Sequence, residues 1–319
     1  MSITRTDLSP STWAVVLAAG DGTRLSTLTR DSTGAPVPKQ FCSLSGGVTL
    51  LQQTLSRARA AARRERTATI VAQQHQRWWQ HMDERTIVQP MNRGTANGIL
   101  LAALTIARRD PAARLVFLPS DHYVEDESRL AAALKAASTK RIARGTLLLL
   151  GLEPSGADPE LGYIVPSSPL RSLSCRPVSR MVEKPPASVA SRLLKEGALW
   201  NSFIFVAEAT AIADLVRARY PQVVADFESA LDGVPQRLNE LYEKLPILDF
   251  SRHILQGAEP RLSVLRVPEC GWSDLGTPRS VAACLDRLAE DSWHMNLAHN
   301  AGLVSLAAAV SPESRLRIA

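Results

Sequence analysis

Apolar runs and segments with helical spacing alternate along the first two-thirds of the chain. Four apolar runs are typical of strands buried on both faces of a sheet: 13–19, 67–72, 114–118 and 145–152. Three segments with a helical spacing of apolar residues separate them: 49–65, 94–109 and 128–140. Strands joined by helices of this length predict right-handed crossovers, and therefore a mainly parallel sheet.

The pattern changes near residue 155. Prolines and serines are frequent over 154–177, and helical spacing returns at 186–197 and 207–219. The last segment, 279–319, predicts a helix and a short tail. We expect an α/β fold with a Rossmann-like, mixed and mainly parallel sheet flanked by helices, followed by a small C-terminal helical segment.

Composition supports a globular protein. The 319 residues are 45% hydrophobic and 21% charged, which suits two domains or one large α/β domain with an appendage. The net charge of +6 is scattered along the chain, which argues against a polyanion binder and fits a small anionic substrate or an arginine-rich surface. Only 6 of the 37 basic residues are lysines, so the chain supplies positive charge with arginine by default, and a lysine inside a motif stands out.

Cysteines and hydropathy give expectations about location. The four cysteines form no CxxC pair and no metal-ligand spacing, as is typical of a reducing compartment. The N-terminus lacks an apolar core of signal-peptide length, and no segment reaches membrane-spanning length. We expect a cytoplasmic protein with neither a membrane nor a nucleic acid as partner.

The stretch VVLAAGDGTRL, residues 15–25, places glycines directly after a buried strand. Gly20, Gly22 and Thr23 can offer backbone N–H groups to a phosphate, and Arg24 adds a charged donor fork. Ligands of such sheets bind beyond the carboxyl ends of the strands. The alternative is a structural glycine turn leading into a helix. A dinucleotide-binding turn is excluded because GxGxxG is absent.

A second candidate for phosphate binding follows in PVPKQF, residues 36–41. Prolines stiffen this loop, and a fixed loop can aim the ammonium of Lys39 at a triphosphate. The alternative is an ordinary exposed lysine.

Together, LAAGDGTRL and PKQF resemble the signature of the sugar-1-phosphate nucleotidyltransferases, and PKQF is most similar to the mannose-1-phosphate guanylyltransferases. Further segments resemble the family in the same order: QPMNRGTANGILLAAL (89–104), VFLPSDHYV (116–124), ELGYIVP (160–166), MVEKPP (181–186), ALWNSFIFV (198–206) and GWSDLGTP (271–278). The resemblance covers roughly 13–280. Phe203 stands where the family usually has glycine, and Asn97 where proline is common.

The resemblance implies a role for each matching residue. Nucleotide binding falls to Ala18, Gly20, Gly22, Thr23, Gln89, Gly94 and Thr95. Catalysis falls to Arg24, Lys39 and Asp121. Sugar phosphate binding falls to Gly162, Glu183, Lys184 and Asn201. Asp121 and Asp274 would hold Mg²⁺, since a carboxylate at a strand end facing a phosphate loop suits a hard, oxygen-seeking ion.

The implied activity is transfer of a nucleotidyl group from GTP to mannose 1-phosphate, giving GDP-mannose and pyrophosphate with Mg²⁺ as cofactor. The catalytic domain would span 1–278, with a nucleotide half (13–150) and a sugar half (151–278), and 279–319 would be the helical appendage. The expected partners are the two substrates and a second copy of the chain in a homodimer. Two alternatives stay open: a nucleotidyltransferase that uses another nucleotide and gives a UDP-, dTDP- or ADP-sugar, and a non-catalytic relative that binds a sugar nucleotide.

Overall fold

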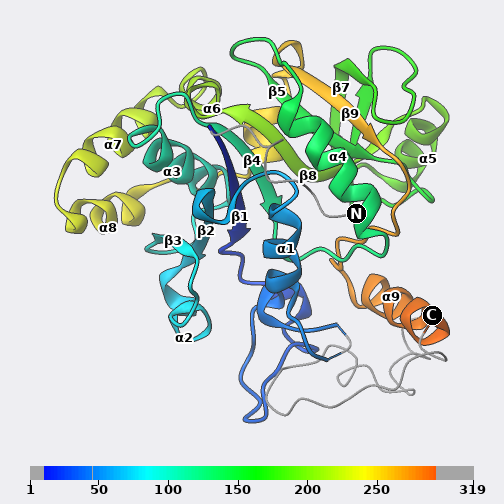
Figure 1. Ribbon diagram of the computed structural model, residues 1–319, viewed down its shortest axis with the longest axis horizontal. Coiled ribbons are helices and arrows are strands. Elements are labelled where there is room, and N and C mark those ends of the chain that lie inside the picture. The colour runs from blue at the N-terminus through cyan, green and yellow to red at the C-terminus, as the bar shows by residue number, and fades with distance from the viewer. Residues whose placement is uncertain (1–10, 45, 292–319) are drawn as a thin grey trace.

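A nine-stranded sheet runs through the part of the chain that the computed structural model describes, residues 11–44 and 46–291 (Figure 1). The spatial order is β3-β2-β1-β4-β8-β5-β9-β7-β6. The strands are β1 (Thr12–Ala18), β2 (Thr67–Ala72), β3 (Arg85–Gln89), β4 (Arg114–Pro119), β5 (Leu147–Leu152), β6 (Gly162–Pro166), β7 (Cys175–Glu183), β8 (Leu199–Glu208) and β9 (Leu262–Val267).

The sheet is mixed, as the sequence predicted. Strands β3, β2, β1 and β4 are parallel neighbours, and β5 is parallel to β9. Strand β8 runs antiparallel to both β4 and β5, and β6 and β7 also pair in antiparallel fashion. The carboxyl ends of β1, β3 and β4 therefore meet at one edge of the sheet, which is where ligands of such sheets bind.

Helices cover both faces of this sheet (Figure 1). Their bounds are α1 (Leu50–Ala58), α2 (Gln76–Trp79), α3 (Thr95–Ala107), α4 (Glu127–Thr139), α5 (Ala187–Lys195), α6 (Ala209–Arg217), α7 (Pro221–Asp232), α8 (Pro235–Lys244) and α9 (Pro278–Asp291). Side chains of α1, α4, α5 and α9 join one hydrophobic cluster, and those of α3, α6, α7 and α8 join another.

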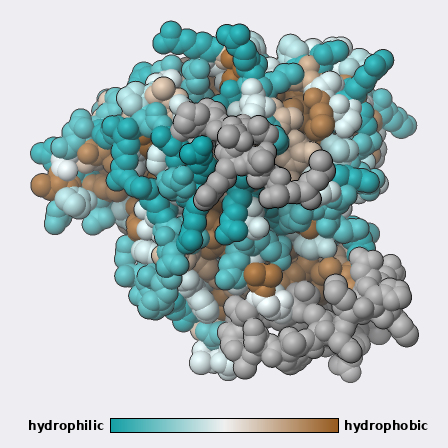
Figure 2. Space-filling view, in the orientation of Figure 1, coloured by the Kyte–Doolittle hydropathy of each residue, from teal (hydrophilic) through white to brown (hydrophobic). Residues whose placement is uncertain are grey.

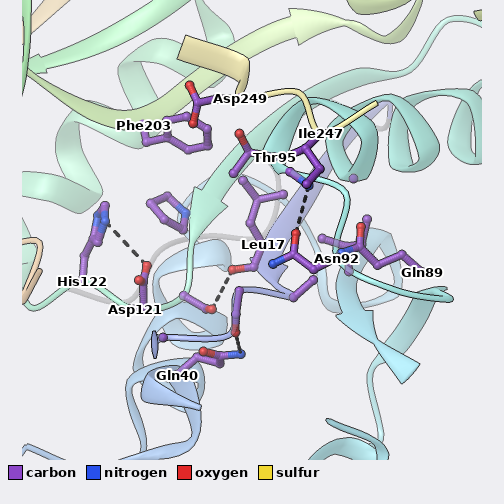
Figure 3. A pocket seen from close by; sticks show the side chains of 18 residues that line it. Leu17, Gln40, Gln89, Asn92, Thr95, Asp121, His122, Phe203, Ile247 and Asp249 are labelled. Atoms are coloured by element: carbon purple, nitrogen blue, oxygen red, sulfur yellow. Dashed lines mark hydrogen bonds and ion pairs between the residues drawn. The ribbon is translucent and has the colours of Figure 1, made fainter. Parts of the chain in front are cut away.

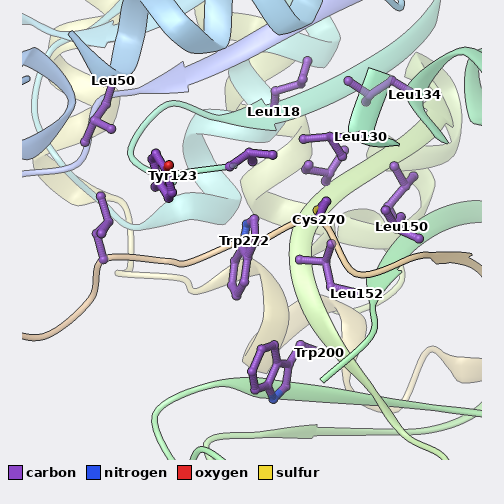
Figure 4. Close-up of a cluster of buried hydrophobic side chains, with 14 of the residues drawn as sticks. Leu50, Leu118, Tyr123, Leu130, Leu134, Leu150, Leu152, Trp200, Cys270 and Trp272 are labelled. Atoms are coloured by element: carbon purple, nitrogen blue, oxygen red, sulfur yellow. The ribbon is translucent and has the colours of Figure 1, made fainter. Parts of the chain in front are cut away.

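The alternation of side chains along β1 shows why there are two clusters. Val16 packs into the cluster with α1 and α4, and its neighbour Val15 packs into the cluster with α3 and α6; neither is exposed. Figure 4 shows part of the first cluster, which includes Leu118, Leu150 and Trp272. Each fully buried side chain of this size contributes about 1.5–3 kcal/mol relative to exposure, so the core holds the strand ends rigidly.

Several element boundaries differ from those predicted. The helix expected over 49–65 ends at Ala58, although Thr49 begins it with a capping box that includes Gln52. The helix expected from 207 begins at Ala209, because β8 continues to Glu208. Helix α9 begins at Pro278, and residues 292–319 of the expected C-terminal segment lie outside the described residues.

The molecular surface shown in Figure 2 is largely hydrophilic, with apolar residues near the end formed by α7 and α8. Val234, between these two helices, is 60% exposed. Among the described residues, no helix has both the length and the apolar character needed to cross a membrane.

Candidate active site

A cavity of about 400 Å³ opens at the carboxyl ends of β1, β3 and β4 (Figure 3). Its lining comes from segments that are far apart in the sequence. It includes Gly20 and Gly22 after β1, Gln89 at the end of β3, Thr95 at the start of α3, and Asp121 after β4. With Gly94, six of the residues predicted for nucleotide binding and catalysis therefore share one pocket.

A side chain of the PKQF segment, that of Gln40, fixes the backbone of the glycine-rich turn. The side-chain amide of Gln40 donates to the carbonyl oxygens of Ala18 (2.9 Å) and Gly20 (3.0 Å). Gly22 has a positive φ of 62°, and a Cβ there would lie 3.0 Å from the backbone nitrogen of Lys39. Thr23 begins a short 3₁₀ turn and, like Ala18, lies outside the cavity lining. Gln40 is thus a positioning residue that the sequence reading did not single out.

Asp21, also within this turn, is a further residue that the sequence reading missed. Its carboxylate accepts hydrogen bonds from Gln74 (2.8 Å) and Asn92 (2.9 Å), and it lies 3.4 Å from His75 Nε2. These partners follow β2 and β3, so Asp21 ties the turn to the ends of two neighbouring strands. Burial lowers the pKa of His75, against the opposing effect of Asp21.

The end of the cavity near β3 contains a buried amide with an unused acceptor. Gln89 is 2% exposed, and its Oε1 atom has no hydrogen-bond partner among the described residues. Gly98 of α3 faces it, since a Cβ there would lie 2.9 Å from Oε1. Gly94 permits a close approach to Leu248, whose carbonyl oxygen would lie 2.3 Å from a Cβ. The hydroxyl of Thr95 accepts a hydrogen bond from the backbone of Phe250 (2.8 Å), so it is partly engaged within the protein.

Lys39 lies deep in the site rather than at the surface. It is 5% exposed, and its ammonium group donates to Asp121 Oδ2 (2.9 Å), the carbonyl oxygen of Asp274 (2.6 Å) and the carbonyl oxygen of Leu275 (3.2 Å). An ammonium has three donors, so all three have acceptors here. The exposed-lysine alternative is therefore wrong, and Lys39 links the two segments that carry the aspartates.

A backbone bridge brings those two segments together, although 150 residues separate them. Tyr123 and Ser273 exchange hydrogen bonds of 2.9 and 3.0 Å as an isolated antiparallel bridge. Asp121 lies two residues before one strand of this bridge, and Asp274 lies one residue after the other. The carboxylate of Asp274 accepts a hydrogen bond from the backbone of Gly276 (2.9 Å). No local spacing along the chain indicated that these two segments meet.

Burial and neighbouring groups set the charge of Asp121 and both the charge and the tautomer of His122. Burial would raise the pKa of Asp121, but Lys39 and His122 together bring that pKa below its usual value. Burial lowers the pKa of His122 to about 4, against the effect of Asp121, so the imidazole is neutral at pH 7. The indole N–H of Trp272 donates to His122 Nδ1 (3.2 Å), which leaves the proton on Nε2, 3.6 Å from Asp121.

A buried arginine supports this turn from behind. Arg57 of α1 donates from Nε to both carboxylate oxygens of Glu127 (2.8 and 2.9 Å) and from Nη1 to the carbonyl oxygen of His122 (3.0 Å). Only 5% of its side chain is exposed. The contact with both carboxylate oxygens fixes α4 and the His122 carbonyl relative to α1.

The residues predicted for sugar phosphate binding lie beside the cavity but are not part of its lining. A Cβ on Gly162 would lie 2.5 Å from a carboxylate oxygen of Glu183, so glycine makes room for that carboxylate. Burial and then Asp249 raise the pKa of Glu183. The side-chain amide of Asn201 donates to the Ser251 hydroxyl (3.2 Å) and accepts from the backbone of Phe203 (3.1 Å). Asn201 is thus already engaged within the protein.

Two basic residues of the predicted site lie at the surface: Arg24, expected to act in catalysis, and Lys184, expected to bind the sugar phosphate. Arg24 is about half exposed and lies 3.5 Å from Glu160. It does not line the cavity. Lys184 is exposed, with a positive φ of 48°, and its backbone N–H donates to Leu161.

Comparisons with known proteins identify the family. Residues 13–290 match the family described as nucleotidyl transferase. Mannose-1-phosphate guanylyltransferase 2 of Escherichia coli O157:H7 is 30% identical over 84% of this chain and 58% of its own length. Mannose-1-phosphate guanylyltransferase of Escherichia coli K12 is 29% identical over 83% of this chain and 58% of its own length. The chain thus spans less than two-thirds of these curated relatives.

Solved structures agree in fold. A protein named mannose-1-phosphate geranyltransferase from Thermus thermophilus aligns with a TM-score of 0.75 and 31% identity, covering 92% of this chain and 83% of its own. UDP-glucose pyrophosphorylase complexed with UDP-glucose aligns at 0.59 with 12% identity, covering 88% of this chain and 99% of its own, and shows a shared fold. The chain therefore belongs to the nucleotidyl transferase family, among the sugar-1-phosphate nucleotidyltransferases that its motifs resemble.

Proposed function

We propose that this protein transfers a nucleotidyl group from GTP to mannose 1-phosphate, releasing pyrophosphate. The observation that carries the proposal is the pairing of the Asp121 and Asp274 segments around Lys39, beside a cavity that Asp121 and the glycine-rich turn line. The names of the relatives, mannose-1-phosphate guanylyltransferases, support the choice of substrates.

The reaction requires little covalent chemistry from the protein. A phosphate oxygen of the sugar 1-phosphate forms a bond to the α-phosphorus of the triphosphate, and the bond between the α-phosphorus and the bridging oxygen breaks as pyrophosphate leaves. The protein has to hold two anions in line and offset the charge between them. The glycine-rich turn would hold the triphosphate, Arg24 would turn from Glu160 to the departing pyrophosphate, and Lys184 would hold the sugar phosphate.

The residues present fit a magnesium ion. Carboxylate oxygens are the protein ligands that Mg²⁺ prefers, and one or two of them with substrate phosphates are a common set. The carboxylate of Asp121 pairs with Lys39, and Asp274, whose backbone carbonyl accepts from the same ammonium, would supply the second carboxylate. The described residues hold no cluster of three or more His, Cys, Asp or Glu side chains. A bound Mg²⁺ would neutralise phosphate charge and polarise the reacting phosphoryl group. The role of Lys39 would then be to hold the two aspartates in place.

Recognition of the base would fall to Gln89. Its buried amide offers an acceptor oxygen and a donor NH₂ group, and the unpartnered Oε1 can accept the N1–H of guanine while the NH₂ donates to O6. The N3–H and O4 of uracil or thymine present the same pair of groups. The same observation therefore favours a pyrimidine nucleotide as the second candidate.

A panel of triphosphates tests the proposal. GTP, UTP, dTTP and ATP are each combined with mannose 1-phosphate or glucose 1-phosphate in Mg²⁺, and pyrophosphate release is followed. We expect the highest kcat/KM with GTP and mannose 1-phosphate, and a loss of at least about 10²-fold in kcat for Asp121→Asn. A preference for UTP or dTTP would change the nucleotide that we assign as substrate and leave the proposed reaction type unchanged. Tight binding of GDP-mannose without turnover of any pair would identify a non-catalytic binding protein.

A further inference from the structure

Three of the four described non-glycine residues with a positive φ belong to the candidate site or lie next to one of its residues. Four non-glycine residues among those described adopt this conformation: Leu173, Lys184, Phe203 and Leu275. Lys184 is one of the residues expected to bind the sugar phosphate, and Leu275 directly follows the second aspartate, Asp274. Phe203 lines the cavity itself. A bulky residue is strained at a φ of 58°, and such strain is concentrated at functional sites.

An irregularity in β8 accounts for the direction of the Phe203 side chain. In the ladder between β5 and β8, Leu149 pairs with Phe205 but Gly151 pairs with Asn201, so the register shifts between them. The extra residues of β8 bulge out of the ladder around Phe203. A β-bulge re-aims a side chain that regular alternation would direct elsewhere, and bulges are common next to active sites.

Neighbouring rings fix the phenyl ring of Phe203 in the cavity wall. Its centroid lies 6.3 Å from those of Phe205 and Phe250, and both contacts are edge-to-face. The residue is only partly buried and lines the cavity beside Asp249, as Figure 3 shows, with Gln89 and Asn92 at the other end. Part of an apolar ring therefore remains available to a ligand, away from the end that holds Gln89.

Polar groups suited to sugar hydroxyls surround this ring. The backbone N–H of Phe203 donates to Asn201, and the Glu183 carboxylate lies close enough to Asp249 for the latter to raise the pKa of Glu183. Phe203 thus lines the cavity and is joined by a hydrogen bond to Asn201, one of the residues proposed for sugar phosphate binding. An apolar wall with a few convergent polar groups is the usual composition of a small-molecule site.

We propose that Phe203 is a specificity-determining residue, whose ring packs against the C–H face of the hexose in the sugar 1-phosphate. A pyranose has C–H groups on one face, with slightly positive hydrogens, and the face of an aromatic ring is slightly negative. The ring takes the apolar face of the sugar, while Glu183 and Asp249 accept from its hydroxyl groups. This inference rests on the proposed function and adds the residue that selects a hexose.

Kinetics with a matched control test the inference. Phe203→Gly removes both the ring and the strain, Phe203→Leu keeps apolar bulk without an aromatic face, and Leu173→Gly removes the same backbone strain away from the cavity, where Leu173 is 38% exposed. We expect Phe203→Gly to raise the KM for the hexose 1-phosphate about tenfold or more, the size of one apolar contact in a pocket, with the triphosphate KM within about twofold. Phe203→Leu should give an intermediate KM, and Leu173→Gly none of this change.

A binding measurement without turnover provides the second readout. Calorimetry measures the affinity of the protein for GDP-mannose and for GDP. The difference between the two affinities gives the contribution of the mannose moiety. We expect Phe203→Gly and Phe203→Leu to weaken GDP-mannose and leave GDP unchanged. Equal KM values for the hexose 1-phosphate in wild type and both variants, or parallel loss of both substrates, would overturn the role of Phe203 while the proposed function stands. Wild-type protein that neither turns over nor binds any sugar nucleotide would overturn both.

Discussion

Replacing Lys39 with methionine removes a buried cation that joins both aspartate segments. The ammonium makes three hydrogen bonds, to Asp121 and to the carbonyl oxygens of Asp274 and Leu275. Hydrogen bonds to charged groups contribute about 1.5–3 kcal/mol each. The Asp121 side chain is 39% exposed, so water compensates part of the loss there. The two carbonyl groups lose a charged donor in a protected position. We expect the free energy of unfolding to fall by about 2–4 kcal/mol.

Activity should fall as well, because the aspartates lose their common anchor. Removal of one preorganised charge-stabilising group costs roughly 10²–10³-fold in kcat, and we expect Lys39→Met to lose this much in kcat/KM. Urea unfolding followed by fluorescence gives the stability, and pyrophosphate release at saturating Mg²⁺ gives the rate. Lys195→Met, at an exposed lysine of α5, is the control and should leave both values unchanged. A Lys39→Met variant that unfolds within about 1 kcal/mol of wild type and retains its turnover would refute the anchoring role of this lysine.

Three further variants probe other contacts. Arg57→Met removes the donor to the His122 carbonyl and should lower the free energy of unfolding by about 2–3 kcal/mol in urea; a loss under about 1 kcal/mol would contradict this. Glu183→Gln should raise the free energy of unfolding at pH 7, because burial and Asp249 disfavour its charged form. The same variant should weaken hexose 1-phosphate binding, and unchanged affinity in calorimetry would exclude Glu183 from the site. Burial lowers the pKa of His75 in the folded protein below its ordinary value of 6.5. As the pH falls through about 6.5, the imidazole therefore takes up a proton in the unfolded chain before it does so in the folded protein. Wild-type stability should therefore fall below about pH 6.5, and His75→Gln should reduce that slope in thermal unfolding; an unchanged slope would show that His75 is not the group responsible.

The first half of the fold could be predicted from the sequence because its strands are continuous apolar runs. Strand β2 has the bounds that were predicted, and β4 differs by one residue. Helix-length segments between buried strands allow few topologies, so the carboxyl edge of the sheet was also predictable.

The second half was harder to predict because its strands are polar on one face or irregular. Strand β7 has charged residues and a proline, and only Val178 and Met181 are buried. Its partner β9 pairs with it over only part of its length. Antiparallel strands half exposed to solvent lack the continuous apolar run that marked β1, so 175–183 could not be recognised by hydropathy alone.

The candidate site shows the same division between local and distant signals. The glycine-rich turn and Lys39 stand in short motifs, which a sequence reading can find. The contacts of Lys39 with Asp274 join positions 235 residues apart, and only the folded chain shows them. Gln40, Asp21 and Arg57 were missed because their roles are to hold other segments, and no local spacing indicates a partner on another strand.

The most direct test of the proposed reaction is pyrophosphate release from GTP and mannose 1-phosphate in Mg²⁺, measured for wild type, Asp121→Asn and Asp274→Asn in parallel. We predict rapid release by wild type and a loss of at least about 10²-fold in kcat for each variant, since each removes one carboxylate that we assign to the metal. Wild-type turnover that survives in both variants would contradict the claim that the two carboxylates form one site.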